Sequence, residues 1–338
     1  MCIAVDAMGG DYAPTVNVDG AIAAAREFRI QTLLVGRSAD LKRLLRHAGY
    51  SGPDIEVIDA AEVVTMNDPG TAAIRKKDSS IRVAANRVRD GRAAGLVSAG
   101  NTGATMVAAK MVIGTIEGVD RPALATILPN LKGHCLLLDV GANPDAKTAH
   151  IKEFAVMGSI YAELVFGKKS PSIGLMSIGE EDTKGTASTK EVFKTLKETG
   201  LNFIGNVEGR DVFNGRVDVI VTDGFTGNVI LKVSEALAEM VEQLLREEIK
   251  KTLKASVGFL LSRSAFRSFK SRLDYSEYGG APLLGVKGCV IICHGRSSAK
   301  AVKNAIRLAA EFARQGLAEK IRSSVADLHA REERLQKA

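Results

Sequence analysis

Short apolar runs alternate with amphipathic segments along the first part of the chain. Residues 3–5, 32–35 and 55–58 are apolar runs of strand length, and residues 16–28 and 39–48 carry apolar positions at helical spacing. Strands and helices that alternate in this way are typical of a doubly wound sheet with right-handed crossovers. The pattern therefore predicts an α/β protein with three layers, α/β/α, around a mostly parallel sheet.

Six apolar runs end in polar loops that contain glycine. These strand-and-loop segments are residues 3–11, 96–105, 136–143, 174–181, 219–228 and 290–298. In an open α/β sheet, the loops at the carboxyl ends of the strands meet at one crevice, where ligands bind. We therefore expect the polar residues of the six loops to share one site.

The loop in residues 96–105 is well suited to an anion. Its glycine turn leaves backbone N–H groups free, and the Ala- and Met-rich helix that follows adds the positive end of its dipole. The candidate phosphate-binding residues of this loop are Ser98, Gly100, Asn101, Thr102 and Gly103. The other loops add the candidates Asp139, Asn143, Thr226, Asn228, His294, Arg296 and Ser297. Together these residues predict a phosphate-sized anion site.

Two further features each have two interpretations. The consecutive cations Arg75, Lys76 and Lys77 either neutralise an anionic substrate or form a solvated helix face. His150 stands near the start of a helix predicted for residues 148–166, where it either contacts a ligand or caps the helix. The sequence leaves both questions open.

A long amphipathic helix is predicted for residues 229–254, and a basic segment follows it. No acidic residue lies between Glu248 and Asp274, and lysines and arginines there alternate with apolar residues. This composition favours an interfacial helix or a site for an acidic protein, and a helical hairpin packed on its own dimer fits as well. The candidate contact residues are Phe259, Leu260, Leu261, Arg263, Phe266, Arg267 and Lys270.

These patterns divide a single catalytic unit into three parts. Residues 1–231 and 275–320 are expected to form the α/β core, and residues 232–274 the long helix with a protruding hairpin. Residues 321–338 are rich in charge, and we expect a frayed tail there.

Composition adds few constraints. Hydrophobic residues make up 46% of the chain and charged residues 25%, which is ordinary for a globular protein. No apolar run reaches the ~18 residues of a transmembrane helix, and the chain opens directly on a strand, so we expect neither a membrane span nor a signal peptide. The net charge of +7 does not by itself indicate a nucleic-acid partner. Cys289, Cys293 and His294 are closely spaced, but buried thiols on a strand are a better interpretation than a metal site.

Several common catalytic motifs are missing. The chain has no G-x-G-x-x-G dinucleotide fingerprint, no Walker loop and no G-x-S-x-G nucleophile elbow. Loops of Gly, Ser, Thr and Asn with a few cations remain, and such loops bind phosphate and stabilise an oxyanion. A suitable reaction is attack of phosphate on a thioester, because a thiolate with a pKa near ~8.5 leaves with little acid catalysis. The protein would then hold phosphate beside the carbonyl and donate hydrogen bonds to the oxyanion.

Eight short motifs, in this order over most of the chain, resemble those of the bacterial phosphate acyltransferase family. They are VDAMGGD at 5–11, AIRKKDSS at 73–80, SAGNTG at 98–103, RPALA at 121–125, LDVGAN at 138–143, IGEE at 178–181, DGFTGNV at 223–229 and YGGAPLLG at 278–285. Each motif is weak alone, and the ordered set is specific. Members of this family make acyl phosphate from an acyl-acyl carrier protein and inorganic phosphate, for phospholipid synthesis.

The resemblance implies a fold similar to the isocitrate-dehydrogenase-like and phosphotransacetylase folds. It implies a cytoplasmic homodimer that associates peripherally with the membrane, uses no metal or organic cofactor, and passes its product to the membrane glycerol-3-phosphate acyltransferase. The motifs place the catalytic candidates of the family on Lys184 and Asn228. The basic hairpin, residues 256–273, matches the region for membrane and carrier-protein contact.

Three positions depart from the family pattern. Tyr12 stands where the family often has histidine, and Ser177 and Thr186 stand where asparagines are common, so Tyr12 is given no catalytic role. Three other functions remain as alternatives: phosphotransacetylase-like transfer from acyl-coenzyme A, a nicotinamide-dependent dehydrogenase on a related fold, and a membrane adaptor without catalysis. The acid-free hairpin favours an acidic carrier protein over coenzyme A.

Overall fold

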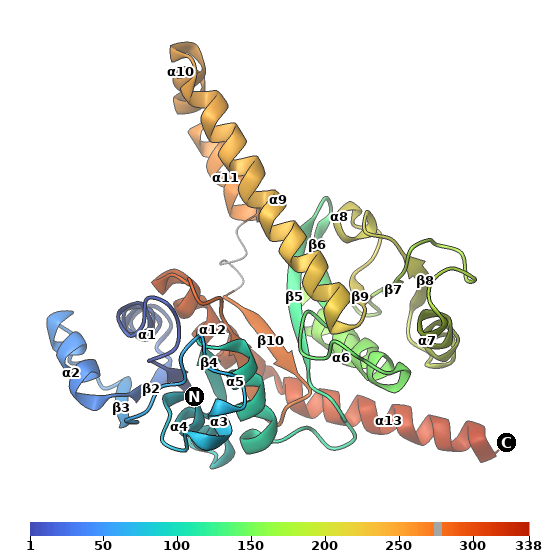
Figure 1. The fold of residues 1–338 in the computed structure, drawn as a ribbon, viewed down its shortest axis with the longest axis horizontal. Helices are drawn as coiled ribbons and strands as arrows, with labels where there is room; N and C mark the ends of the chain where they lie inside the picture. The colour runs from blue at the N-terminus through green and yellow to red at the C-terminus, as the bar shows by residue number, and fades with distance from the viewer. Residues whose placement is uncertain (274–278, 338) are drawn as a thin grey trace.

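The computed structural model describes residues 1–273 and 279–337, with side chains except those of 268, 270–273, 331–333 and 335–337 (Figure 1). The side chain of the predicted contact residue Lys270 and the first residues of the predicted core segment 275–320 therefore lie outside the described part. One sheet runs through the molecule, with strand order β3-β2-β1-β4-β11-β10-β5-β6-β9-β7-β8. Helices cover both faces, which confirms the three-layer prediction.

The amino-terminal half follows the predicted alternation closely. Its elements are β1 (Cys2–Asp6), α1 (Thr15–Phe28), β2 (Gln31–Gly36), α2 (Ser38–His47), β3 (Ile55–Asp59), α3 (Ala72–Arg75), α4 (Ser80–Arg89), β4 (Gly95–Ser98), α5 (Thr102–Ala108) and the π-helix η1 (Ala109–Ile113). Strands β3, β2, β1 and β4 pair in parallel. Strand β11 (Cys289–Ile292) continues this set, because it pairs in parallel with β4.

The second half contains a smaller parallel set. Its elements are β6 (Gly133–Leu138), α6 (Thr148–Phe166), β7 (Ile173–Met176), α7 (Ala187–Glu198), β8 (Phe203–Val207), α8 (Asp211–Asn214) and β9 (Val219–Val221). Strands β6, β9, β7 and β8 pair in parallel. Helix α6 has the bounds that the sequence predicts.

Two antiparallel strands join the halves and reverse the direction of the sheet. Strand β10 (Ala281–Leu284) is antiparallel to both β11 and β5 (Ala123–Asn130), and β5 is antiparallel to β6. The loops after β1, β4 and β11 therefore leave one edge of the sheet, whereas those after β6, β7 and β9 leave the opposite edge. The six polar loops thus leave from two edges of the sheet, which the sequence could not show because an apolar run does not reveal the direction of its strand.

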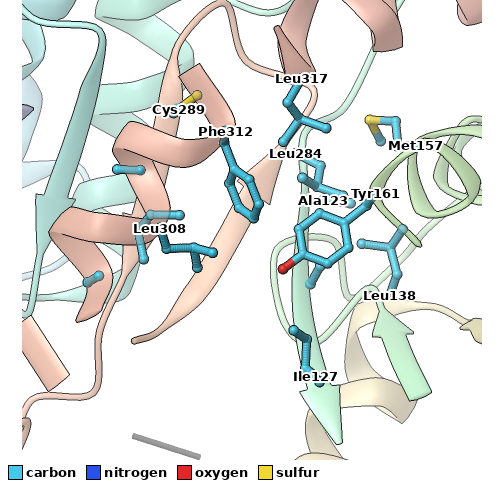
Figure 2. Packing of buried hydrophobic residues seen from close by; sticks show 14 of the residues in the cluster. Ala123, Ile127, Leu138, Met157, Tyr161, Leu284, Cys289, Leu308, Phe312 and Leu317 are labelled. Carbon is cyan, nitrogen blue, oxygen red and sulfur yellow. The ribbon is translucent and has the colours of Figure 1, made fainter. Parts of the chain in front are cut away.

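The core continues across this junction. On one face, alternate β5 residues including Ala123 and Ile127 pack under α6 and α12 (Ala299–Gln315), and Figure 2 shows Tyr161 of α6 beside Phe312 of α12. Their rings meet edge to face at 5.2 Å between centroids. The other β5 positions point to the opposite face. The two halves therefore share one hydrophobic layer, and the other face of β5 is left for a groove.

The carboxyl-terminal region corrects one prediction. The predicted frayed tail belongs to helix α13 (Leu317–Lys337). Ile321, Val325 and Leu328 of α13 are buried, and the helix packs against α6. An apolar face at three- and four-residue spacing thus anchors a segment that its charge had marked as tail.

Helix α9 (Gly224–Lys250) projects from the body, and α10 (Leu253–Leu261) and α11 (Arg263–Leu273) fold back along it (Figure 1). This arrangement confirms the predicted protruding hairpin. Several apolar α9 side chains stay exposed: Val233, Leu237, Met240, Val241 and Leu244.

Candidate active site

A groove of about 1600 Å³ runs over the middle strands of the sheet. Leu124, Thr126 and Leu128 of β5 line it together with α9 and the hairpin. Pockets for small molecules usually enclose about 300–1,000 Å³, so this groove has room for a long substrate. Polar residues from both halves line it as well: Thr102, Asn228, His294, Arg296 and Ser297. The central antiparallel pair thus brings together loops that leave opposite edges of the sheet.

Asn101 holds the first turn together. Its Oδ1 accepts a hydrogen bond from the Ala104 amide at 2.9 Å and so caps α5. Its Nδ2 donates to three carbonyls of a neighbouring loop, those of Thr65, Met66 and Asp68, of which the last is closest at 2.7 Å. The amide is fully used within the protein. The prediction that Asn101 binds phosphate is therefore replaced by a structural role.

Ser98 and Gly100 are also engaged inside the protein. Ser98, which is 0% exposed, donates from Oγ to Asp6 Oδ2 at 2.8 Å and accepts from the Gly100 amide at 3.1 Å. Burial raises the pKa of the Asp6 carboxyl above its usual range, and hydrogen bonds to the carboxyl oppose this shift. A Cβ placed on Gly9 would come within 2.7 Å of the Gly100 nitrogen. The predicted ligands Ser98 and Gly100 thus build the loop, while Thr102 stays exposed in the groove.

Asn17 is a buried clamp that the sequence analysis missed. Its Nδ2 donates to the carbonyls of Ala7 at 3.0 Å and Gly9 at 2.9 Å, with a longer contact to that of Asp6. Asn17 is 1% exposed on the packed face of α1. A lone asparagine among the apolar positions of that helix was the available signal, because a buried amide requires partners.

The turn before α9 distributes its bonds differently. Asp223 caps α9 by accepting from the Thr226 amide and from Thr226 Oγ1, each at 2.8 Å. The hydroxyl of Thr226, a candidate ligand, therefore already donates its hydrogen bond within the protein. No described residue forms a hydrogen bond with the Asn228 side chain, which is exposed, lines the groove and lies beside Gly141. Asn228 is therefore free to bind a substrate.

Asp139 and Asn143 organise the loop after β6. The Asp139 carboxylate is 0% exposed and accepts from the amides of Leu124, Gly141, Ala142 and Asn143. The Asn143 amide donates to Asp139 and to the Pro122 carbonyl, both within 2.9 Å. Burial raises the pKa of Asp139, and these hydrogen bonds oppose the shift. Both predicted ligands thus face inward and hold the loop beside Asn228.

The loop after β11 is anchored at several points. The Cys293 amide donates to the Ser98 carbonyl, and the Asp11 amide donates to the Gly295 carbonyl, each at 2.8 Å. The Arg296 side chain is 78% exposed, with its Nε 3.9 Å from Asp11 Oδ2. This loop therefore presents a cation, together with His294 and Ser297, to the groove.

Lys184 lies on the loop between β7 and α7 and does not line the groove. The loop leaves the same edge as the Asp223 turn, because β7 and β9 are parallel neighbours. Lys184 is exposed, and within the described chain its ammonium has no ion-pair partner. The adjacent acid Glu180 is bound by Arg210 and Arg216, at 2.7 and 2.8 Å. Lys184 thus lies on a loop at the same edge of the sheet as the Asp223 turn, and no described carboxylate pairs with it.

Lys76 and His150, from the two features with open interpretations, are bonded inside the protein, whereas Arg75 and Lys77 stay exposed. Lys76 bonds Asp68 Oδ2 at 2.8 Å, and this bond holds the pKa of Asp68 at about 2. His150 is buried, accepts from the Lys147 amide at its Nδ1 and meets Asp120 Oδ2 at 2.7 Å from its Nε2. His150 is therefore a capping histidine, as one of the two interpretations held. Neither Lys76 nor His150 lines the groove.

The remaining predictions concern the cysteines, a metal site and a membrane span. Cys135, Cys289 and Cys293 are buried, and burial raises the pKa of the last two to about 12. In the part of the chain that the structure describes, no cluster of His, Cys, Asp and Glu is suited to a metal ion, and no helix is long and apolar enough to span a bilayer.

Four predicted contact residues of the hairpin line the groove: Phe259, Arg263, Phe266 and Arg267. Leu260 and Leu261 point outward, 65% and 81% exposed.

Known proteins match both the sequence and the fold of this chain. A phosphate acyltransferase of Geotalea uraniireducens (strain Rf4) is 54% identical over 318 residues, 94% of this chain and 92% of that protein. One of Geobacter sulfurreducens is 52% identical over 322 residues, 95% and 93% of the two chains. Among solved structures, a phosphotransacetylase of Streptococcus pyogenes superposes with a TM-score of 0.65 at 18% identity, over 93% of this chain and 94% of that one. At such low identity the last match shows the fold alone.

A family model described as "Fatty acid synthesis protein" matches residues 1–320. With relatives above half identity over nearly their full length, this match settles the family. The chain belongs to the fatty acid synthesis protein family, whose curated relatives are named phosphate acyltransferases, and it is an acyltransferase.

Proposed function

We propose that this enzyme makes acyl phosphate from a fatty acyl-acyl carrier protein and inorganic phosphate, and so supplies glycerol-3-phosphate acylation in phospholipid synthesis. The observation that carries the proposal is the groove. Apolar side chains of β5 and α9 line its length, and Thr102, Asn228 and Arg296 stand at its polar part. An acyl chain fits the first surface, and a phosphate beside a thioester carbonyl fits the second.

Roles for individual residues follow from which polar groups are free. Thr102, Ser297 and the guanidinium of Arg296 are the phosphate ligands, because the side chains of Ser98 and Asn101 are already bonded inside the protein. Asn228 donates a hydrogen bond to the reacting carbonyl. Lys184 approaches by movement of its exposed loop and offsets charge on phosphate or on the oxyanion.

The hairpin supports a carrier protein as acyl donor. Arg263 and Arg267 line the groove, so an acidic carrier could dock beside the opening while its acyl group enters. Leu260 and Leu261 are exposed at the tip of the hairpin and are suited to peripheral association with a membrane. Such an enzyme works at the cytoplasmic membrane surface, beside the glycerol-3-phosphate acyltransferase that consumes its product.

The exposed apolar stripe of α9 outside the groove supports a homodimer. Val233, Met240 and Leu244 are each at least half exposed and follow helical spacing. A surface of this kind on a protruding helix is suited to the same helix of a second copy. The dimer and membrane contacts then use different parts of the hairpin.

The experiment is release of free carrier protein from a long-chain acyl-acyl carrier protein, with and without phosphate. Hydroxylamine traps acyl phosphate as the hydroxamate. The proposal predicts release that requires phosphate and yields hydroxamate, and release independent of phosphate would overturn it. Acyl-coenzyme A run in parallel tests the phosphotransacetylase-like alternative.

A further inference from the structure

His294 lines the groove on a well-anchored loop. It lies two residues after β11, and the backbone around it is tied to β4 through Cys293 and to the loop after β1 through Gly295. The Ser297 amide closes the turn by donating to the His294 carbonyl at 2.9 Å. The imidazole itself is exposed and lines the groove with Thr102 and Asn228. A well-anchored backbone thus presents this ring to a bound substrate.

One hydrogen bond defines the tautomer of the ring. The backbone amide of Arg296 donates to His294 Nδ1 at 3.2 Å. A ring nitrogen accepts a hydrogen bond only when it carries no proton, so the proton of the neutral ring resides on Nε2. In the neutral ring, this bond therefore leaves Nε2–H as the donor.

The donor has no partner among the described residues, in contrast to His150, whose Nε2 meets Asp120 at 2.7 Å. Asn228 comes from the other half of the sheet and likewise has no hydrogen-bond partner in the described part of the chain. Two unused donors thus reach one groove from opposite halves of the sheet.

We infer that neutral His294 donates a hydrogen bond from Nε2–H to the oxyanion of the tetrahedral intermediate, opposite Asn228. This inference rests on the proposed function. A phosphate oxygen forms the bond to the thioester carbon, and the carbonyl electron pair moves onto oxygen. The Nε2 proton stays on nitrogen throughout. The carbonyl then re-forms, the C–S bond breaks, and the electron pair leaves with the thiolate, which takes a proton from water.

A neutral donor is well suited to this reaction. It stabilises charge that appears only in the transition state, and it does not transfer a proton to the phosphate nucleophile. A neutral imidazole held in one tautomer polarises a carbonyl in this way in other enzymes. Arg296 and Ser297 remain available to bind the phosphate.

The test compares His294→Phe, His294→Gln and His294→Asn in the phosphate-dependent release of carrier protein. The Phe variant should lose about 100-fold in kcat, the usual cost of one oxyanion donor, with the KM for phosphate changed by less than about threefold. The Gln variant carries an N–H near the Nε2 position and should recover most of kcat. The Asn variant reaches only the Nδ1 position and should stay low. His47→Phe, on the exposed surface of α2, is the matched control and should leave turnover unchanged.

A second measurement decides the tautomer without catalysis. The chain has five histidines, and loss of one ring signal in His294→Gln assigns His294 in a ¹⁵N spectrum of the full-length protein. In the neutral ring, we expect Nδ1 without a proton and Nε2 with one. A proton on Nδ1, full turnover of the Phe variant, a loss confined to the KM for phosphate, or rescue by Asn as good as by Gln would each overturn the inference. Wild-type release that does not need phosphate would instead overturn the proposed function.

Discussion

The starts of α5 and α9 are alike in sequence and opposite in use. Each follows a buried strand and has an Asn, a Thr and glycines at the beginning of the helix. Before α5, Asn101 caps the helix and binds a neighbouring loop. Before α9, Asp223 is the cap, and Asn228 is left free in the groove. The side chain that caps a helix is already hydrogen-bonded within the protein. The position of the cap therefore determines which asparagine can act on a substrate.

The largest expected difference between the two turns is the effect of their asparagines, Asn101 and Asn228, on turnover. Asn228→Ala should lower kcat by about 100-fold, because it removes a hydrogen bond to the reacting carbonyl, and should leave the melting temperature unchanged. Steady-state release of carrier protein and thermal unfolding measure the two effects. Asn202→Ala, an exposed asparagine far from the groove, is the matched control. Wild-type kcat in Asn228→Ala would remove Asn228 from the mechanism.

Close backbone contact occurs in both turns: a Cβ on Gly227 would clash with the Asp139 carbonyl, and one on Gly9 would meet Gly100. In Gly9→Ala the new Cβ would lie 2.6 Å from Asp6 Oδ2 and 2.7 Å from the Gly100 nitrogen. Because backbone forms part of this contact, we expect a loss of about 3 kcal/mol in the free energy of unfolding. Denaturant titration is the measurement, with Gly209→Ala as control, since its Cβ would meet nothing within 4 Å. Equal stability of the two variants would contradict the interlocked loops.

Asn101 should contribute to the stability of the fold rather than to catalysis. Asn101→Ala removes the α5 cap and the bonds to the neighbouring loop, and should lower the free energy of unfolding by about 2 kcal/mol. Asn101→Asp keeps the cap acceptor but sets a carboxylate against the carbonyls of Thr65, Met66 and Asp68. The Asp variant should therefore be no more stable than the Ala variant in urea titration. An Asp variant as stable as wild type would show that the amide donor is dispensable.

Glu153 provides a reference outside both turns. Burial and nearby Asp120 raise its pKa to about 7, although the Asp120 amide donates to the carboxylate. The unfolded chain ionises first, so stability from the neutral form is complete below pH about 4.5 and is lost as pH rises through about 7. Relative to Glu153→Gln, wild type should lose about 1–2 kcal/mol over this range. Urea titrations of both proteins between about pH 5 and pH 8 measure it. A constant difference would contradict a raised pKa, and kcat of the variant should match wild type.

The sequence predicts the elements of the fold better than their direction. Helix α6, the long α9 and the apolar strands come from periodicity, which local side chains determine. The reversal at β5 and β10 depends on pairing between distant strands, such as Leu283 with Leu124, which no local pattern encodes. The α13 helix was missed because its buried positions are sparse among charges.

The sequence also predicts the members of the site better than their roles. Thr102, Asn228, His294, Arg296 and Ser297 do meet in one groove. Ser98, Asn101 and Asp139 have the same chemistry but are bonded internally, since burial makes a polar side chain find a partner. Lys184 was assigned by family resemblance, and its distance from the groove depends on a loop that the sequence does not place.

A further test of this interpretation concerns Lys184. Lys184→Ala should lower turnover strongly and leave folding intact, because its ammonium bonds no described carboxylate. Lys190→Ala, exposed on the following helix, is the control. Wild-type turnover in Lys184→Ala would remove the lysine from the mechanism and leave the groove to act alone.

The most direct test of the central claim is mass spectrometry of the product formed from acyl-acyl carrier protein and ¹⁸O-labelled phosphate. If phosphate is the nucleophile, the acyl phosphate retains every labelled oxygen of the phosphate, including the one that bridges carbon and phosphorus. Acyl phosphate with an unlabelled bridge, or free fatty acid as the only product, would contradict the account, because water rather than phosphate would then have attacked the thioester.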